Sequence, residues 1–423
     1  MSQSVLIDVD ALRVGMFIQL ELGWMKHPFP MSNFRLSSAE QIRVLREIGL
    51  KAVRYVPAKS SHVLEGRRES ALEAVASQRH EDEVLEPDEV AATDLLAQFN
   101  ASQKRCTQRF QEATRTYAAV SATVQAEPRQ AREQAETLIG TSVADLLTKG
   151  PCAVHLLAGG VGQPSAVHAV NVMVLALLLG QSLGLQAQQL HGLGVSALLH
   201  DIGKLGLPAY VGEPGAALTA VDRRRYQSHV GLSVELAQRM DLPSDVLIAI
   251  AQHHEMANGS GYPLHLLADD ISPWGQILAL VNRYDRLCNP LHGEEALTPH
   301  EAVARLFALL RANFDASVLG AFIRMMGVYP PGSLVQLVDG RYAVVVVVDP
   351  SHALRPCVVP YQKGVPRGDA AVLNLAGMPE LGILRSLKPA QLPRAALDYL
   401  LSQPRISYFF ERALGSPDRG DCA

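Results

Sequence analysis

The stretch "SALLHDIGKLGLP", residues 196–208, decides how the rest of this chain is interpreted. Three apolar residues, 197–199, lead directly into His200 and Asp201. A carboxylate at the edge of an apolar interior is costly unless an opposite charge or a metal ion pairs with it. We therefore expect Asp201 to have a cationic or metallic partner.

Further histidines recur at intervals of roughly one helix-loop-helix unit, and a helical domain can bring them to one centre. They are His168, His229 and the adjacent pair His253 and His254. Nitrogen and carboxylate ligands without thiolates suit Mn, Fe or Zn. Two such ions can clamp a phosphate and generate a hydroxide nucleophile at neutral pH. A lone histidine is more often a hydrogen-bonded core residue, and we interpret the remaining candidates in that way: His155, His191, His265, His292 and His300.

Two further features lie beside these histidines. Lys204, one turn after His200, is either a surface lysine favoured by a helix C-terminus or a contact to a phosphate, and a neighbouring metal pair favours the second interpretation. The run "NGSGYP" at 258–263 is turn-forming. Its Gly261 allows close backbone approach, and Tyr262 and Pro263 supply a rigid, flat wall, so we expect this loop to border the site.

Composition excludes several classes of protein. The chain has 423 residues and a net charge of −4, which predicts two to four domains and no general attraction to nucleic acid. The apolar run "VMVLALLLG" at 172–180 is shorter than the roughly 20 residues of a membrane span. The N-terminus lacks the pattern of a signal peptide. Five scattered cysteines without a C-x-x-C pair favour a reducing cytoplasm.

The pattern of apolar and polar residues along the chain predicts a multidomain, mainly α-helical protein in four parts. Residues 1–58 read as a small α+β domain, with strands in "VLIDVDALRVGMFIQLEL" and "KAVRYV" around a helix. Residues 59–140 read as a polar linker followed by a helical stalk, and residues 141–327 as an all-helical domain that holds the histidines. Residues 328–423 read as a β-rich extension, with an Asp-Gly hairpin in "LVQLVDGRYAVVVVVDP".

The stalk helix, at 93–127, carries apolar residues in a heptad pattern. Two interpretations are open: the helix packs on its own domain, or it forms a parallel homodimer. The seam residues are Phe99, Cys106, Phe110, Ala113, Tyr117, Val120 and Val124.

Taken in order, "HDIGK", "YQSHVGLSVEL" around His229 and "HHEMANGSGYP" closely resemble the HD-GYP subgroup of HD-superfamily metal phosphohydrolases. The resemblance covers about 141–327. The stretch "VLIDVDALRVGMFIQLELGWMKHPF" resembles a small domain often found ahead of HD-GYP domains, and "GVYPPGSLVQLVDG" resembles a common C-terminal extension.

The resemblance implies an all-helical domain with divalent iron or manganese ions and hydrolysis of the bacterial messenger cyclic di-GMP to pGpG or GMP. It implies that Asp201 bridges two metals, that Lys204 contacts the scissile phosphate, and that Gly261, Tyr262 and Pro263 form the loop that gives the subgroup part of its name. The remaining metal ligands that it implies are His168, His200, His229, His253, His254 and, at the last ligand position, Asn282.

Three departures from the family pattern bear on this site. Asn282 stands where the family has an aspartate, and Asp285 lies three residues further on. Pro164 replaces the glutamate of members with three metals, so we expect two metals. The run "CNPLHGEE" replaces an Arg-containing run, which predicts a loss of basic groups near the phosphates or guanines.

These observations favour a metal-dependent cyclic di-GMP phosphodiesterase. One alternative is a degenerate module that binds the nucleotide or a signalling protein with little or no turnover. Another is a phosphohydrolase that acts on a different nucleotide.

Overall fold

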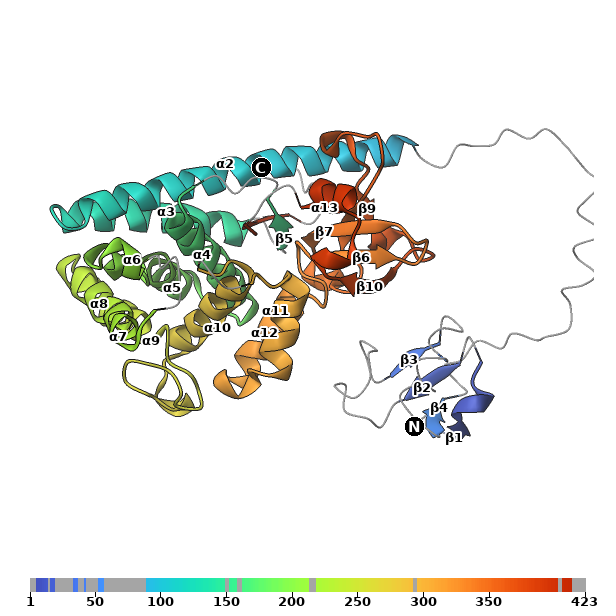
Figure 1. The fold of residues 1–423 in the computed structure, drawn as a ribbon, viewed down its shortest axis with the longest axis horizontal. Helices are drawn as coiled ribbons and strands as arrows, with labels where there is room; N and C mark the ends of the chain where they lie inside the picture. Colours follow the sequence, from blue (N-terminus) through green and yellow to red (C-terminus); the bar gives the residue numbers. More distant parts are fainter. Residues whose placement is uncertain are drawn as a thin grey trace, which may run out of the picture. The chain divides into compact units, whose positions relative to one another are not determined.

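The computed structural model describes residues 5–13, 16–19, 33–36, 42, 52–56, 89–148, 152–157, 162–212, 218–291, 295–401 and 405–412. The chain divides into two compact units, residues 1–87 and 88–423, each with a sheet of its own (Figure 1). The expected fold class, a mainly α-helical protein with an N-terminal α+β unit and a strand-rich C-terminal region, is confirmed. The linker at 59–88 and most of the helix expected before residue 51 lie outside the described residues.

The first unit contains an antiparallel sheet of four short strands in the spatial order β1-β4-β2-β3. The buried side chains of Ile18, Leu36 and Val53 belong to its small core. The strands predicted at both ends of "VLIDVDALRVGMFIQLEL" and in "KAVRYV" are confirmed. The elements are β1 (Val5–Asp8), η1 (Val9–Ala11), β2 (Phe17–Gln19), β3 (Asn33–Arg35) and β4 (Ala52–Tyr55).

Two long helices begin the second unit, α2 (Glu89–Thr123) and α3 (Pro128–Thr148), and α2 runs along the helical body (Figure 1). The heptad side chains of α2 pack into the chain's own core, where Phe110 is fully buried and Tyr117 is nearly so. These side chains therefore pack on their own domain, which was the first of the two interpretations. A homodimer through 93–127 stays a prediction. Because the seam is internal, Phe110→Glu or Tyr117→Glu would damage the fold rather than test dimerisation.

A central helix, α4 (Pro164–Ser182), is buried along almost its whole length and is surrounded by the other helices. Since nearly every residue from 166 to 180 is enclosed, this helix reads as uniformly apolar rather than amphipathic. The helices around it are α5 (Ala187–Leu199), η3 (Ile202–Gly206), α6 (Ala209–Gly212), α7 (Ala220–Gln227), α8 (His229–Arg239), α9 (Ser244–Gln252), η4 (Ala268–Asp270), α10 (Pro273–Cys288), α11 (Pro299–Ala308), η5 (Arg311–Asn313) and α12 (Ala316–Met326).

A second sheet has seven strands, six of which follow the helices in sequence, and its main path has the order β10-β6-β7-β5-β11. The hairpin turn at Asp339 and Gly340 is confirmed, with Gly340 at a φ of 89°. The strands are β5 (Cys152–Leu156), β6 (Leu334–Leu337), β7 (Tyr342–Val348), β8 (Cys357–Pro360), β9 (Leu373–Asn374), β10 (Ile383–Leu387) and β11 (Tyr408–Arg412), with α13 (Arg394–Leu400) and the short η6 (Pro350–His352), η7 (Arg367–Asp369), η8 (Leu375–Gly377) and η9 (Pro389–Gln391) between them.

The strand β5 lies within residues 141–327, the segment expected to be entirely helical, but it belongs to the same sheet as the strands after residue 328. This strand precedes the helices in sequence, yet it pairs antiparallel with β7 and with β11 near the C-terminus. All five of its residues are buried, so the sheet is continuous with the helical core. The helical and strand-rich parts of residues 88–423 thus form one compact unit.

Among the described helices, α4 alone has the length and apolarity of a possible membrane span, and 83% of its most apolar segment is buried inside the protein. A core helix of this kind passes the same test, so α4 is weak evidence for a membrane span.

Candidate metal centre

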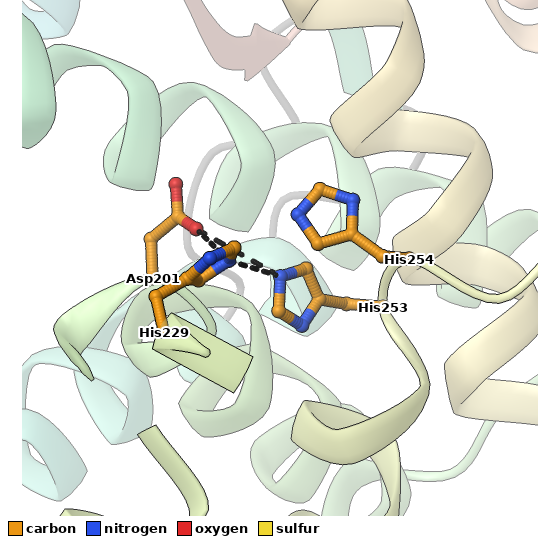
Figure 2. Close-up of side chains that lie close together, drawn as sticks. All are labelled: Asp201, His229, His253 and His254. Atoms are coloured by element: carbon orange, nitrogen blue, oxygen red, sulfur yellow. Dashed lines mark hydrogen bonds and ion pairs between the residues drawn. The ribbon is translucent and has the colours of Figure 1, made fainter. Parts of the chain in front are cut away.

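The ends of three helices meet at one point of the second unit and carry its chemistry. His200 and Asp201 follow the last residue of α5, and His229 is the first residue of α8. The adjacent pair His253 and His254 follows the end of α9. Figure 2 shows Asp201 facing His229 and His253, with His254 beside them. Each of these residues lies at or next to a helix end, so the hydrogen bonds of the helix fix the backbone from which its side chain projects.

Gly203 of the "HDIGK" stretch lets η3 lie directly against α8. A Cβ atom at this position would be 2.3 Å from the carbonyl oxygen of His229 and 2.3 Å from the amide nitrogen of Ser233. The amide of Gly203 also donates a hydrogen bond to Ser233 Oγ at 2.9 Å. The glycine therefore fixes the distance between the helix that presents His229 and the turn that presents Asp201.

Three of the histidines share one orientation. In each of them Nδ1 contacts a backbone carbonyl oxygen, which can only accept, so Nδ1 carries the proton and Nε2 has a free lone pair. The three Nε2 atoms point into the centre. The distances from Nδ1 to oxygen are 2.7 Å from His200 to Ala197, 2.5 Å from His229 to Tyr226 and 2.6 Å from His253 to Ile250.

His168 on α4 reaches the same state through a carboxylate. Its Nδ1 donates to Asp285 Oδ2 at 2.6 Å, which leaves Nε2 facing His200 Nε2 at 3.2 Å. This contact places Asp285 behind the imidazole of a candidate ligand. Asp285 also accepts hydrogen bonds from Asn171 and Asn289. Carboxylates of this kind commonly orient metal-binding histidines and raise their basicity.

The carboxylate of Asp201 lies at the middle of the histidines. Its Oδ2 is 3.4 Å from Nε2 of both His168 and His200, and its Oδ1 is 3.2 Å from His229 Nε2 and 3.7 Å from His253 Nε2. Each carboxylate oxygen therefore faces a different pair of imidazoles. This arrangement is the one that a carboxylate bridging two cations needs.

The charge states favour metal ligation. Burial lowers the pKa of His200 and of His229 despite the opposing charge of Asp201, and it lowers the pKa of His253 and His254 well below the usual value. For Asp201, burial would raise the pKa, but Lys204, His200 and His168 together bring it well below its usual range. At neutral pH these four imidazoles are therefore neutral and the carboxylate is ionised, which are the protonation states that metal binding requires.

A divalent metal pair fits these residues. His229 Nε2 and His253 Nε2 are 3.3 Å apart, so two lone pairs face one another with no proton between them. Three shielded polar atoms have no hydrogen-bond partner among the described residues: Asp201 Oδ1, His254 Nε2 and Asn282 Oδ1. Such atoms are costly to bury without a partner. The ligand atoms form two groups, each within 4.8 Å: Asp201, His229, His253 and His254, and then His168, His200 and Asp201.

Asn282 on α10 is buried, and its amide oxygen is one of the unpartnered atoms. It is one turn before Arg286 and three residues before Asp285 on the same helix. The structure brings together six of the residues predicted as metal ligands, His168, His200, Asp201, His229, His253 and His254, whereas metal ligation by Asn282 stays a prediction. Pro164, the first residue of α4, brings no ligand atom.

A pocket of about 440 Å³ opens beside Asp201, and Lys204 lies in its wall. Lys204 Nζ donates to Asp201 Oδ2 at 2.6 Å. The helix α2 forms the facing wall with Tyr117 and Ser121. The described lining does not include Gly261, Tyr262 or Pro263, for which substrate contact stays a prediction.

Arg286 was missed by the sequence reasoning. Its Nη2 donates to Asp201 Oδ2 at 3.1 Å, and its side chain lines the same pocket. The helix α10 thus supplies a cation beside Asp201 before the run "CNPLHGEE" begins, while the loss of basic groups within that run stays a prediction. The only available signal was the 3.6-residue period, which puts Arg286 one turn from Asn282 on the same face.

The loop that follows the histidine pair is held by a second residue that the sequence reasoning did not single out. Glu255 is fully buried and accepts hydrogen bonds from the amides of Leu264 and Leu266 at 2.6 and 2.9 Å. A Cβ atom on Gly261 would be 2.4 Å from the amide nitrogen of Met256, so the loop needs glycine there. Tyr262 stacks on His254 with 4.5 Å between the ring centres, which places this loop at the edge of the metal centre.

The histidines interpreted as structural lie elsewhere in the described parts of the chain. His155 is buried in β5, His191 contacts a carbonyl of α3, and His300 contacts the carbonyl of Val328. His265 has a φ of 56° in the loop before η4. His292 lies outside the described residues.

Comparison with known proteins agrees with the order of the motifs. The sequence model of the HD domain family matches residues 152–318, and a domain of unknown function, DUF3391, matches residues 4–135. The cyclic di-GMP phosphodiesterase PA4108 of Pseudomonas aeruginosa is 28% identical over 83% of this chain and 84% of its own length. The HD domain match and these relatives support assignment of the chain to the HD-GYP family.

Other HD-GYP relatives match over shorter regions. A 3'3'-cGAMP-specific phosphodiesterase 3 of Vibrio cholerae is 26% identical over 39% of this chain and 36% of its own length. Among solved structures, Bd1817, an HDG"Y"P protein of Bdellovibrio bacteriovorus, is 18% identical, with a TM-score of 0.42 over 76% of this chain and 98% of that chain.

Proposed function

We propose that this HD-GYP protein is a metal-dependent phosphodiesterase that hydrolyses cyclic di-GMP to pGpG or GMP. The observation that carries the proposal is the convergence of unprotonated Nε2 atoms on a buried carboxylate whose Oδ1 has no hydrogen-bond partner in the described structure. Two divalent cations, iron or manganese, would supply a clamp for the phosphate and a hydroxide nucleophile at neutral pH. The residues that would hold them are His168, His200, Asp201, His229, His253, His254 and Asn282.

The protein's own cations act on the substrate phosphate. Lys204 and Arg286 lie in the pocket wall beside Asp201, and their side chains are only 14% and 17% exposed. A cation held in such a partly dry site stabilises negative charge on a phosphate more strongly than it would in water. Lys204 would contact the scissile phosphate, and its flexible stem allows the ammonium to turn from Asp201 toward a phosphate oxygen.

The pocket also offers contacts for the rest of a dinucleotide. Ser121 Oγ on α2 is shielded from solvent and has no hydrogen-bond partner among the described residues, and Gln163 lies beside it. These groups can hydrogen-bond to a base or ribose. Relatives are named for cyclic di-GMP and for 3'3'-cGAMP, so a cyclic dinucleotide is the substrate class that they support.

A second candidate function is a module that binds the nucleotide or a signalling protein with little turnover. Asn282 favours it, because an amide in place of a carboxylate removes one negative charge from the metal centre. A cytoplasmic location and signalling partners, both expected from the sequence, belong to the same proposal.

The test is a hydrolysis assay on the full chain, loaded with Fe(II) without oxygen or with Mn(II). We expect cyclic di-GMP to be converted to pGpG or GMP, faster than 3'3'-cGAMP, and Asp201→Ala to lose both metal and activity. If the metal-loaded protein binds cyclic di-GMP without cleaving it, the binding module is the correct function. If it cleaves 3'3'-cGAMP preferentially, the proposed substrate is wrong.

A further inference from the structure

The two oxygens of Asp201 have different surroundings. Two protein cations contact Oδ2, which Lys204 Nζ approaches to 2.6 Å and Arg286 Nη2 to 3.1 Å. In contrast, Oδ1 has no hydrogen-bond partner among the described residues and faces His229 and His253. A cation bound on the Oδ1 side would find a free lone pair, whereas one on the Oδ2 side would share its oxygen with two positive charges.

The remaining ligands do not offset this difference. On the Oδ2 side, the other candidate ligands are His168 and His200, to which the family pattern adds Asn282, and none of the three carries a negative charge. The nearest additional carboxylate, Asp285, contacts Nδ1 of His168 and lies behind the ring. A cation on this side would therefore meet no anionic ligand except an oxygen that Lys204 and Arg286 already contact.

On the Oδ1 side, three imidazoles are ready to bind. His229 and His253 direct unprotonated Nε2 atoms at one another, and His254 Nε2 is shielded from solvent without a partner. Among the described side chains, neither the ammonium of Lys204 nor the guanidinium of Arg286 contacts Oδ1. This half has a complete set of one carboxylate oxygen and three nitrogens, which suits a divalent transition metal.

We propose that Arg286 gives the two halves of the metal centre different affinities for a divalent ion. One half binds an ion tightly and is formed by Asp201 Oδ1, His229, His253 and His254. The guanidinium of Arg286 weakens binding in the other half, which is formed by His168, His200 and Asn282. Arg286 thereby acts as a positioning residue for Asp201 and takes up part of the negative charge that a second metal would need. This inference rests on the proposed metal-dependent function, and it assigns the order in which the two halves fill.

The test is titration of the metal-free full chain with Mn(II), followed by calorimetry and electron paramagnetic resonance. For the unmodified chain we expect one tight Mn(II) and a second that binds at least about tenfold more weakly. With one equivalent, the spectrum should show an isolated ion. Arg286→Gln removes the charge at similar length, so it should tighten the second ion about tenfold and give the spectrum of a coupled pair at two equivalents.

Two control variants test whether the positive charge at residue 286, rather than the shape of the side chain, weakens binding of the second ion. Arg283→Gln makes the same change on the exposed face of the same helix and should leave both affinities unchanged. Arg286→Lys keeps the charge and should bind Mn(II) like the unmodified chain. Equal filling of both halves in the unmodified chain would overturn the inference, as would identical titrations for Arg286→Gln and Arg283→Gln, or tightening in Arg286→Lys.

The proposed function fails in a different way. If the unmodified chain binds no Mn(II) and no Fe(II), the metal centre itself is wrong, and the inference is overturned with it. If the chain binds two equally tight ions and cleaves cyclic di-GMP, the function stands and only the role of Arg286 is wrong.

Discussion

The carboxylate of Asp285 lies 2.6 Å from Nδ1 of His168, behind the imidazole rather than on its metal-facing side. Asn282, three residues earlier on α10, has an amide oxygen that is shielded from solvent without a hydrogen-bond partner in the described structure. The helix α10 therefore carries a residue that orients a candidate ligand, Asp285, and an unpartnered amide oxygen that we propose as the last metal ligand.

Asn282→Asp should strengthen metal binding. A carboxylate at this position adds a negative charge where hard divalent ions prefer one, so we expect the weaker Mn(II) to bind at least about tenfold more tightly and the hydrolysis rate to rise. Metal analysis and calorimetry measure the first effect. Asn100→Asp, on the exposed face of α2, introduces the same charge elsewhere and should change neither quantity. Unchanged metal occupancy in Asn282→Asp would mean that residue 282 is not a ligand.

Asp285→Asn should weaken metal binding less than Asp201→Ala does. Its amide can no longer accept from His168, Asn171 and Asn289 together, so we expect about a tenfold loss of affinity and a loss of about 1–3 kcal/mol in unfolding free energy. Calorimetry with Mn(II) and denaturant unfolding provide the two measurements. Complete loss of one ion at saturating Mn(II) would instead identify Asp285 as a direct ligand.

Gly203→Ala should disrupt the centre from a position that touches no metal. The new methyl group would lie 2.3 Å from the backbone of α8, so η3 must move away from His229. We expect destabilisation of about 1–3 kcal/mol or more, together with weaker metal binding. The matched control is Gly231→Ala on α8, where a Cβ atom meets nothing within 4 Å. Equal stability of the two variants in thermal unfolding would contradict this account.

Glu255→Gln should loosen the loop beside His254. The change replaces one of two oxygens that accept from the amides of Leu264 and Leu266 with a donor, at a cost of about 1–3 kcal/mol. Limited proteolysis should then cut the segment 256–267 faster, while Glu235→Gln on the exposed face of α8 should digest like the unmodified chain. No change in cleavage rate would show that the loop is held by other contacts.

Lys204→Ala should retain bound metal and slow hydrolysis. The lysine contributes no ligand atom, and its loss removes a cation from both Asp201 and the phosphate. Metal content and turnover measured on the same preparation test both parts. Loss of metal in proportion to activity would assign Lys204 a structural role.

The sequence allowed site residues to be predicted where titratable side chains occur directly beside apolar runs. His200, Asp201 and the pair His253 and His254 could be found because titratable residues beside apolar runs need partners. The strand β5 could not be found, since its five residues become a strand only by pairing with segments some 200 residues later. Arg286 was missed for a similar reason: an arginine on a helix is usually solvent-exposed, and only the packing of α10 against α4 and α9 brings it to Asp201.

The last strand is tied to the metal centre through backbone contacts. Asn171 and Asn289, which both donate to Asp285, also donate to the carbonyl oxygen of Ile406, and Asn171 accepts from the amide of Tyr408. The support behind His168 is therefore completed only after residue 408 has been synthesised, some 240 residues after the histidine itself. During synthesis this ligand therefore lacks its full support until residues 406–408 are available, and contacts between residues so far apart in sequence generally form slowly. A chain cut before residue 405 would keep every predicted ligand in its sequence and still lack the anchor that orients one of them.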